Sequence, residues 1–256
     1  MKKRTLTLLI AAIVAAYCGV LFYLSRMPSL YAVLVYSARA VFADQGDYGQ
    51  YLYGLQDMRL EPADAPEGQR LTALGMSLVV DTQEPIVEKD NEGFNVFFQI
   101  GEKRGILFQS MKPDKQSDVD TSLLFFGSAL TLKDVLQDEK TRTLFEHATG
   151  KSPDSKYVWE EAIRDATIWD FSFFDNTRNM GVLSLLSAKS VLSEPGTRFY
   201  RFDNGKLIGL VERNKTGTSV LFFSPEDLDT WYDVALLGEF TLDETEAILR
   251  TVSLGK

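Results

Sequence analysis

Cysteine and histidine are almost absent from this sequence of 256 residues, which contains one of each. Cys18 lies inside an apolar run near the N-terminus, so the rest of the chain offers no disulfide and no thiol nucleophile. His147 stands in the segment EKTRTLFEHATG, close to the glycine that should end a charged helix, where histidine interacts favourably with the helix dipole. A single histidine also supplies no transition-metal cluster. These two residue types therefore predict no catalytic triad and no metal site.

Motifs for phosphate or calcium binding are incomplete. Gly150, Lys151 and Ser152 resemble the end of a phosphate-binding loop, but Phe145 occupies the position where that loop needs its first glycine. Two acidic clusters lack the glycine and the terminal glutamate of a calcium loop. They are Asp118 with Asp120, and Glu226 with Asp227 and Asp229. A helix end at Gly150 and solvated acidic turns are the simpler interpretation, so we expect no cofactor, no metal and no catalytic residue.

Acidic residues outnumber basic ones in the chain as a whole, but not at the N-terminal tip. The chain has 27 Lys and Arg against 36 Asp and Glu, and Lys2, Lys3 and Arg4 precede the first acidic residue. The remainder thus carries 24 basic and 36 acidic residues, a net charge of -12. Phosphate backbones and anionic lipid headgroups repel such a body. The balance argues against a nucleic-acid partner and is compatible with a basic protein partner.

One run, Thr5–Leu24, has no charged residue over twenty positions and predicts a transmembrane signal anchor. As a helix it would be ~30 Å long, which matches the hydrocarbon core of a bilayer. The basic tip at residues 1–4 should stay in the cytoplasm, which places the C-terminal body across the inner membrane, in the periplasm. A cleaved signal peptide is the competing interpretation, with its nearest small-residue site ending at Ala43. Tyr17 disfavours a lipid anchor on Cys18, because small residues precede a lipid-modified cysteine.

Two segments separate the anchor from the body. Residues 25–43 contain the apolar stretch PSLYAVLVYSARAVFA, which is too short to cross the membrane again and predicts a membrane-proximal helix. Residues 44–69 contain four Gly and two Pro without an apolar period, as in a linker. The tyrosines of this linker are groups that can dock it locally. Residues 70–256 are then the folded extracytoplasmic domain.

Apolar alternation bounded by turn residues predicts strands in two blocks of the body. They are residues 74–80, 86–88, 94–100, 106–110 and 123–126, and then 197–203, 206–212, 218–223 and 231–237. Helical spacing of apolar residues predicts helices between and after these blocks. They start at Thr131, at Glu139, after Ser155, at Met180 and after Thr241. The expected fold class is α+β, an antiparallel sheet of β-meanders packed with helices.

Two local signals are stronger than the rest. Asn204 and Gly205 tolerate positive φ and predict a hairpin turn. Thr241 and Glu244 form a capping box at the start of the closing helix. The residues expected on the buried face of that helix are Leu242, Thr245, Ile248, Leu249 and Val252.

The last elements follow one another as helix, hairpin, strand, strand and helix. Their sequences are LLSAKSVLSE with a buried lysine, FYRFDNGKLIGLVE, TSVLFF, YDVALLG and TLDETEAILRTV. This order, over residues 155–253, resembles the end of a Mog1/PsbP-type sandwich. It is also similar in outline to bacterial envelope proteins that act as immunity factors against secreted toxins. The resemblance implies a binding scaffold and brings no catalytic motif with it.

The segment Trp169–Asp175 alternates aromatic and acidic side chains between two predicted helices. If exposed, it would be an edge for binding a partner protein, because aromatic and arginine residues dominate interface hot spots. If buried, it would be a short core strand or a loop that plugs the core. The candidate partner-binding residues are Trp169, Asp170, Phe171, Asp175 and Arg178.

Together these features predict a membrane-tethered, non-catalytic protein-binding module of the cell envelope. Its role would be toxin neutralisation of the immunity type, or that of an accessory subunit in an envelope complex. A hydrolase that uses carboxylates or a serine is a second interpretation, with Asp170, Asp175, Asp227 and Asp229 as the acids to inspect first. A third is a small-ligand or lipid carrier, which would contain a large apolar cavity.

Overall fold

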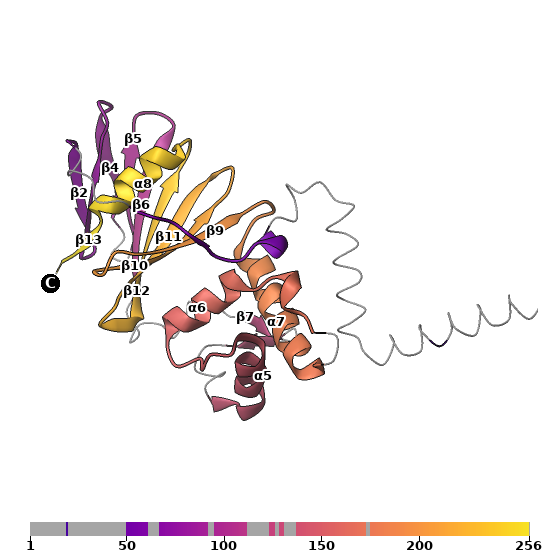
Figure 1. Ribbon diagram of the computed structural model, residues 1–256. Coiled ribbons are helices and arrows are strands. Elements are labelled where there is room, and N and C mark those ends of the chain that lie inside the picture. Colours follow the sequence, from indigo (N-terminus) through magenta and orange to yellow (C-terminus); the bar gives the residue numbers. More distant parts are fainter. Residues whose placement is uncertain are drawn as a thin grey trace, which may run out of the picture.

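The computed structural model describes Gly19 and residues 50–60, 67–91, 95–111, 123–125, 128–130, 137–172 and 175–255 (Figure 1). Within these ranges the fold is α+β, as the sequence predicts, with largely antiparallel sheets packed with helices. None of the helices described is long and apolar enough to cross a membrane. The predicted anchor, Thr5–Leu24, lies outside the described residues apart from Gly19, as do residues 25–43 and the helix start expected at Thr131.

An eight-stranded sheet forms the centre of the molecule, in the spatial order β1, β9, β10, β11, β12, β6, β5, β4. Its strands are β1 (Gln56–Asp57), β4 (Ile86–Asn91), β5 (Asn95–Ile100), β6 (Arg104–Met111), β9 (Arg198–Asp203), β10 (Ile208–Arg213), β11 (Gly217–Ser224) and β12 (Asp227–Leu237). Neighbours are antiparallel except for β1, which runs parallel to β9 at the edge. The two predicted meanders therefore join into one sheet where β12 pairs with β6.

One face of this sheet shares an apolar core with a small sheet and with α8 (Leu242–Thr251). The small sheet has the order β13 (Ser253–Leu254), β3 (Met76–Val80), β2 (Gln69–Ala73). The cross-strand neighbours Val96, Phe108, Val234 and Val220 are all 4% exposed or less. β3 buries every second residue, as the strand period of two requires.

Three helices form a layer on the other side of the main sheet, α5 (Glu139–Thr149), α6 (Lys156–Asp165) and α7 (Asn176–Leu192) (Figure 1). α6 contacts β12, and both α5 and α6 pack on α7, beside which lies the ribbon of β7 (Leu123–Phe125) and β8 (Ser128–Leu130). Their apolar cluster is separate from the first, and in it the Phe145 and Trp159 rings stack at 5.1 Å between centroids. Each helix starts at a local cap, because Asp138, Ser155 and Asp175 each accept the backbone N–H three residues on.

The hairpin between β9 and β10 and the capping box of α8 are present as predicted. The hairpin turn has a positive φ at Gly205, of 78°, but not at Asn204, and other details also differ from the sequence prediction. The linker expected at 44–69 contributes β1 to the sheet, and its last residue begins β2. α7 starts at Asn176 rather than Met180, because the carboxylate of Asp175 caps it. Leu242 was expected on the buried face of α8 but is 41% exposed, since the buried stripe of that helix begins one turn later, at Thr245.

Candidate functional site

Residues 50–58, which we call the strap, run from the helical layer to the edge of the main sheet. At the sheet, β1 pairs with β9, and the Met58 N–H donates to the carbonyl oxygen of Arg201 at 2.8 Å. Gln50 is 4% exposed and Met58 is 8% exposed, so both ends of the strap are buried. Glycine is required at position 54, because a Cβ there would lie 2.6 Å from the carbonyl oxygen of Asp165. The strap is thus an integral part of the fold.

A buried lysine of α7 holds the strap in place. Lys189 is 0% exposed, and its ammonium donates to the carbonyl oxygens of Tyr53 at 3.2 Å, Arg164 at 2.7 Å and Ala166 at 2.8 Å. Its Nζ also lies 4.5 Å from the centre of the Phe199 ring. Burial lowers the pKa of Lys189 to about 7, and the three carbonyl oxygens match the three N–H donors of an ammonium. Lys189 therefore joins the strap, the end of α6 and α7, and the burial expected for the lysine of LLSAKSVLSE is confirmed.

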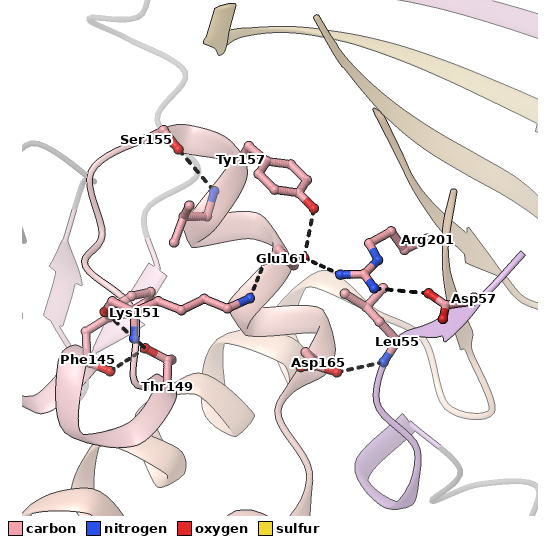
Figure 2. A network of polar contacts seen from close by, with 11 residues as sticks. Leu55, Asp57, Phe145, Thr149, Lys151, Ser155, Tyr157, Glu161, Asp165 and Arg201 are labelled. Carbon is pink, nitrogen blue, oxygen red and sulfur yellow. Dashed lines mark hydrogen bonds and ion pairs between the residues drawn. The ribbon is translucent and has the colours of Figure 1, made fainter. Parts of the chain in front are cut away.

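A buried carboxylate of α6, Glu161, collects donors from three parts of the chain (Figure 2). The Lys151 Nζ lies 2.5 Å from one carboxylate oxygen, while the Tyr157 hydroxyl and the Arg201 guanidinium each donate to the other at 2.8 Å. Arg201 also pairs with Asp57 of the strap at 3.0 Å. Burial opposes ionisation, but the donors together lower the pKa of Glu161. Both oxygens are occupied and the group stays ionised, so the Glu161 cluster joins elements and is poorly suited to accept a proton.

Charged side chains of α6 also face the main sheet. Lys156, Glu160 and Arg164 recur at a spacing of four and are each 6% exposed or less. Glu160 pairs with both of the others, and Arg164 pairs in addition with Glu212 of β10. Burial raises the pKa of Glu160, but the two cations outweigh it and bring the pKa to about 2. This network was not predicted from the sequence, because charged residues are rarely buried, although the spacing of opposite charges along one helix is a visible signal.

The chain between α6 and α7 carries the predicted partner-binding residues. It begins with η2 (Ile168–Asp170), where the Asp170 carboxylate accepts the Thr167 N–H at 2.8 Å and the Thr167 hydroxyl at 2.9 Å in a capping box. Asn179 of α7, which is 2% exposed, bonds the backbone N–H and C=O of Ser172 at 2.7 and 2.6 Å. The backbone of this connection is therefore fixed at both ends.

Trp169 projects from this fixed backbone. Its side chain is 70% exposed, more than any other large hydrophobic residue in the described ranges. Its indole N–H donates to the carbonyl oxygen of Leu52 in the strap at 3.2 Å. Beside it, Arg178 donates to the backbone carbonyl of Asp170 at 2.8 Å and lies 4.0 Å from the Asp170 carboxylate, with both side chains 40% exposed. The indole N–H and the Arg178 guanidinium are therefore hydrogen-bonded to backbone carbonyls, while the indole ring of Trp169 faces solvent.

The five residues that the sequence singled out lie along this connection and the first turn of α7, and we call them the Trp169 platform. Phe171 packs against the helical core, and Asp175 is the N-cap of α7. Each interpretation of this segment describes one part of it, since Trp169 is exposed and Phe171 is half-buried against the helical core. Phe173 and Phe174 lie outside the described residues. The strap residue Leu52 had no sequence signal of its own, although the neighbouring tyrosines indicated local docking.

No protein family, no curated protein and no solved structure matches this chain. The resemblance of residues 155–253 to a Mog1/PsbP-type sandwich stays a prediction.

Among the hollows on the described residues are two of more than 500 Å³, large enough to hold a small molecule. One of about 520 Å³ lies beside the strap and is lined by Asp57, Arg59, Tyr157 and Arg201 among others. The second, of about 540 Å³, lies between the loops after β9 and β11 and the C-terminal residues 252–255. Both open to solvent and carry charged rims, whereas a lipid carrier needs an enclosed apolar cavity.

Asp233 of β12 has a raised pKa, as catalytic acids often do. It accepts a hydrogen bond from the Ser219 hydroxyl at 3.0 Å, and burial raises its pKa to about 6. Within the described residues it takes part in no ion pair with a cation. Neither hollow is lined by Asp233 or Ser219, so the pair has no space for a substrate there.

The acids proposed for a hydrolase are divided between two places. Asp170 and Asp175 belong to the Trp169 platform, whereas Asp227 accepts two backbone N–H groups in the turn that opens β12. Hydrogen bonds with Thr230 lower the pKa of Asp227. Asp229 accepts the Lys156 N–H at 3.0 Å, at the start of α6. Across the described ranges no three metal-ligating side chains gather, and Asp118 and Asp120 lie outside them.

His147 lies exposed in the last turn of α5, as expected for a histidine that interacts with the helix dipole. Gly150 ends that helix with a φ of 70°. The segment at 150–152 therefore follows the C-terminal end of α5, and Lys151 forms an ion pair with Glu161. A phosphate-binding loop would instead open a helix.

Proposed function

We propose that this protein is a membrane-tethered, non-catalytic protein-binding module of the cell envelope, with the Trp169 platform as its partner-binding surface. The helix at Thr5–Leu24 holds it in the inner membrane as a single-pass anchor, and the α+β body lies in the periplasm. Its role is toxin neutralisation of the immunity type or that of an accessory subunit in an envelope complex. One observation carries the proposal: a tryptophan that is 70% exposed stands on a backbone fixed by hydrogen bonds.

The composition of the platform fits a binding hot spot. A tryptophan buries about 150–250 Å² when it is covered, and tryptophan and arginine are enriched among the residues that dominate binding energy. The capping box of η2 and the Asn179 bonds to Ser172 fix the backbone before any partner arrives. Less conformational entropy is then lost on binding, which favours affinity.

The charge of the body indicates the charge of the partner. With a net charge of -12 outside the N-terminal tip, the body attracts basic proteins and repels acidic ones. We expect association to slow as ionic strength rises, because complementary charge mainly raises the rate of encounter.

Affinity purification of the full-length chain from a mild detergent extract tests the binding function. Wild type and Leu242→Ala should recover the same stoichiometric protein partner, whereas Trp169→Ala should recover at least tenfold less. Leu242 is a matched control because it is an exposed apolar residue, at 41%, on α8 and therefore on the opposite side of the main sheet. A wild-type chain that recovers nothing would contradict the proposal, as would equal recovery by Trp169→Ala.

The membrane topology has its own test. A tag at the C-terminus should be digested by protease added outside spheroplasts and protected in intact cells. A tag that stays protected until the inner membrane is lysed would place the body in the cytoplasm and contradict the envelope location.

A further inference from the structure

We infer that the edge of β13 is a second binding surface, which takes an extended peptide segment of apolar and basic residues as an added strand. This inference goes beyond the proposed function, because β13 and the Trp169 platform lie on opposite sides of the main sheet (Figure 1). Three features support it: the unpaired backbone groups of β13, the hollow beside them, and the charge of the rim of that hollow.

The outer side of β13 is unpaired. β13 ends the small sheet and pairs with β3 in an antiparallel register, with Ser253 opposite Ser77. The Gly255 N–H donates to the carbonyl oxygen of Gly75 at 2.6 Å, so the backbone of Gly255 also faces β3. Backbone groups alternate in direction along a strand, and Leu254 therefore directs its N–H and C=O away from β3. Within the described residues neither of these two groups has a hydrogen-bond partner.

The unpaired side of β13 borders the hollow of about 540 Å³, which we call the β13 hollow. Its first wall is the run of residues 252–255, and none of the described residues of β3 lines it. Its second wall is formed by the loops at 205–207 and 224–227 of the main sheet. Domains that bind peptides by strand addition present an open strand edge in this way. A peptide in the β13 hollow would therefore lie alongside β13.

The buried part of the lining is apolar. Leu207 is 3% exposed and Val252 is 7% exposed. Tyr232 and Leu254 are half-buried and pack against the apolar core between the two sheets. Side chains of an added strand point alternately to its two faces, so every second one would meet this lining. An occupant with apolar residues at alternate positions fits the hollow.

The rim favours basic residues at the positions in between. Lys206, Glu226 and Asp227 are the charged residues that line the hollow, and all three are exposed. The two carboxylates outnumber the single ammonium, and the body as a whole has a net charge of -12. The local and the overall charge thus both attract a basic segment.

The edge of the main sheet at β4 differs from β13 in the features that control strand addition. Its pairing with β5 is interrupted by a bulge between Glu88 and Asp90, and Lys89 lies in this bulge. Bulges and charged side chains, lysine above all, keep an edge strand from pairing with another chain. β13 consists of a serine and a leucine in regular pairing with β3. The protection found at β4 is thus missing at β13.

A peptide-binding experiment on the full-length chain in non-ionic detergent tests the inference. The probe is a short fluorescein-labelled peptide of alternating valine and lysine, and its binding is followed by fluorescence anisotropy. Wild type should bind this peptide saturably. The same peptide N-methylated at every amide should bind about tenfold more weakly, because it has no backbone donors. A peptide with glutamate in place of lysine should also bind about tenfold more weakly, because the rim repels it.

Two substitutions at one position separate the backbone of β13 from its side chain. Leu254→Pro removes the outward N–H, and proline is tolerated on the open side of an edge strand, so the fold should be kept. Its affinity for the peptide should fall about tenfold, whereas Leu254→Ala keeps the N–H and should stay within about threefold of wild type. In wild type, hydrogen exchange of the Leu254 amide should slow about tenfold when the peptide binds.

The outcomes separate this inference from the proposed function. A wild-type chain without saturable binding would overturn it, as would equal binding by Leu254→Pro with no protection of the Leu254 amide. Trp169→Ala should bind the peptide as wild type does, and a loss of binding there would assign the peptide to the Trp169 platform instead. Self-association of wild type that Leu254→Pro abolishes, measured by sedimentation velocity, would assign the edge to a second copy of the chain. The purification test of the Trp169 platform is independent of each of these results.

Discussion

The Glu161 cluster and the Trp169 platform are both attached to the strap, and they use polar groups in opposite ways. In the cluster, Lys151, Tyr157 and Arg201 occupy both oxygens of a carboxylate that is 6% exposed. In the platform, hydrogen bonds fix the backbone and the indole N–H, and the ring of Trp169 stays exposed. Saturated polar groups have no capacity left for a ligand and stabilise the fold, whereas a fixed and uncovered ring is available to a partner.

If this contrast is right, substitutions at the strap contacts should change stability, and substitutions at the platform should change binding alone. Three of the four variants below test that division, and Asp233→Asn tests an acid of β12 that belongs to neither region. All four are ordered by the size of the expected effect on the free energy of unfolding. Each is measured by urea unfolding of the full-length chain in detergent.

Lys189→Met should lower the free energy of unfolding by about 3 kcal/mol, because the buried carbonyl oxygens of Arg164 and Ala166 and the part-buried one of Tyr53 lose their donor, and each unsatisfied buried group costs about 1–3 kcal/mol. Protease should also cut the strap sooner. Lys206→Met is the control, since Lys206 is exposed and its loss should change stability by less than about 0.5 kcal/mol. A Lys189→Met protein as stable as wild type would show that the strap is held by other contacts.

Glu161→Gln should cost about 2 kcal/mol, because the amide cannot satisfy Lys151 and Arg201 as a carboxylate does. Glu146→Gln is matched to it, since Glu146 also pairs with an arginine at 2.9 Å but is 41% exposed, and such pairs contribute about 0–1 kcal/mol. The pKa of Glu161 is lowered, so its contribution is present above the ordinary carboxyl pKa and is lost as the pH falls. The difference between Glu161→Gln and wild type should therefore shrink toward acid pH; a constant difference would contradict the assigned ionisation.

Asp233→Asn should stabilise the protein at neutral pH by about 1–2 kcal/mol. A rise in the pKa of Asp233 from 3.8 to about 6 corresponds to a free-energy difference of about 3 kcal/mol. We expect a smaller gain from Asn, because Asp233 is only partly buried and solvent screens its charge. Since the pKa in the fold is raised, the favourable contribution of Asp233 is present below pH 4 and lost as the pH rises through about 6. The gain from Asn should therefore grow between pH 4 and 7. A gain that is independent of pH would show that Asp233 does not titrate in this range.

Trp169→Ala should change the free energy of unfolding least, by less than about 1 kcal/mol, because it removes one solvent-exposed hydrogen bond to Leu52 and little buried area. The same variant should lose its partner in the purification described above. A loss of stability as large as that of Lys189→Met would mean that Trp169 is a structural contact, and the contrast between the two regions would fail.

Local features of the fold were predictable from the sequence because neighbouring residues produce them. The hairpin at Asn204 and Gly205, the capping box of Thr241 and Glu244, and the cap at Ser155 each depend on side chains a few positions from the backbone they bond. The five residues of the Trp169 platform could be grouped from the sequence for the same reason, since they lie within ten positions of one another.

Contacts between distant parts of the chain were not predictable in this way. Nothing near Leu52 indicates that it accepts the indole N–H of Trp169, 117 positions away, and nothing near Gln56 indicates that β1 runs parallel to β9. The role of Lys189 depends likewise on carbonyl oxygens of Tyr53, Arg164 and Ala166. The sequence by itself determined which elements form and which residues are unusual, because those depend on local geometry. Only the tertiary structure decided which side chains are saturated and which are left exposed, because that depends on how the strap, α6 and α7 pack together.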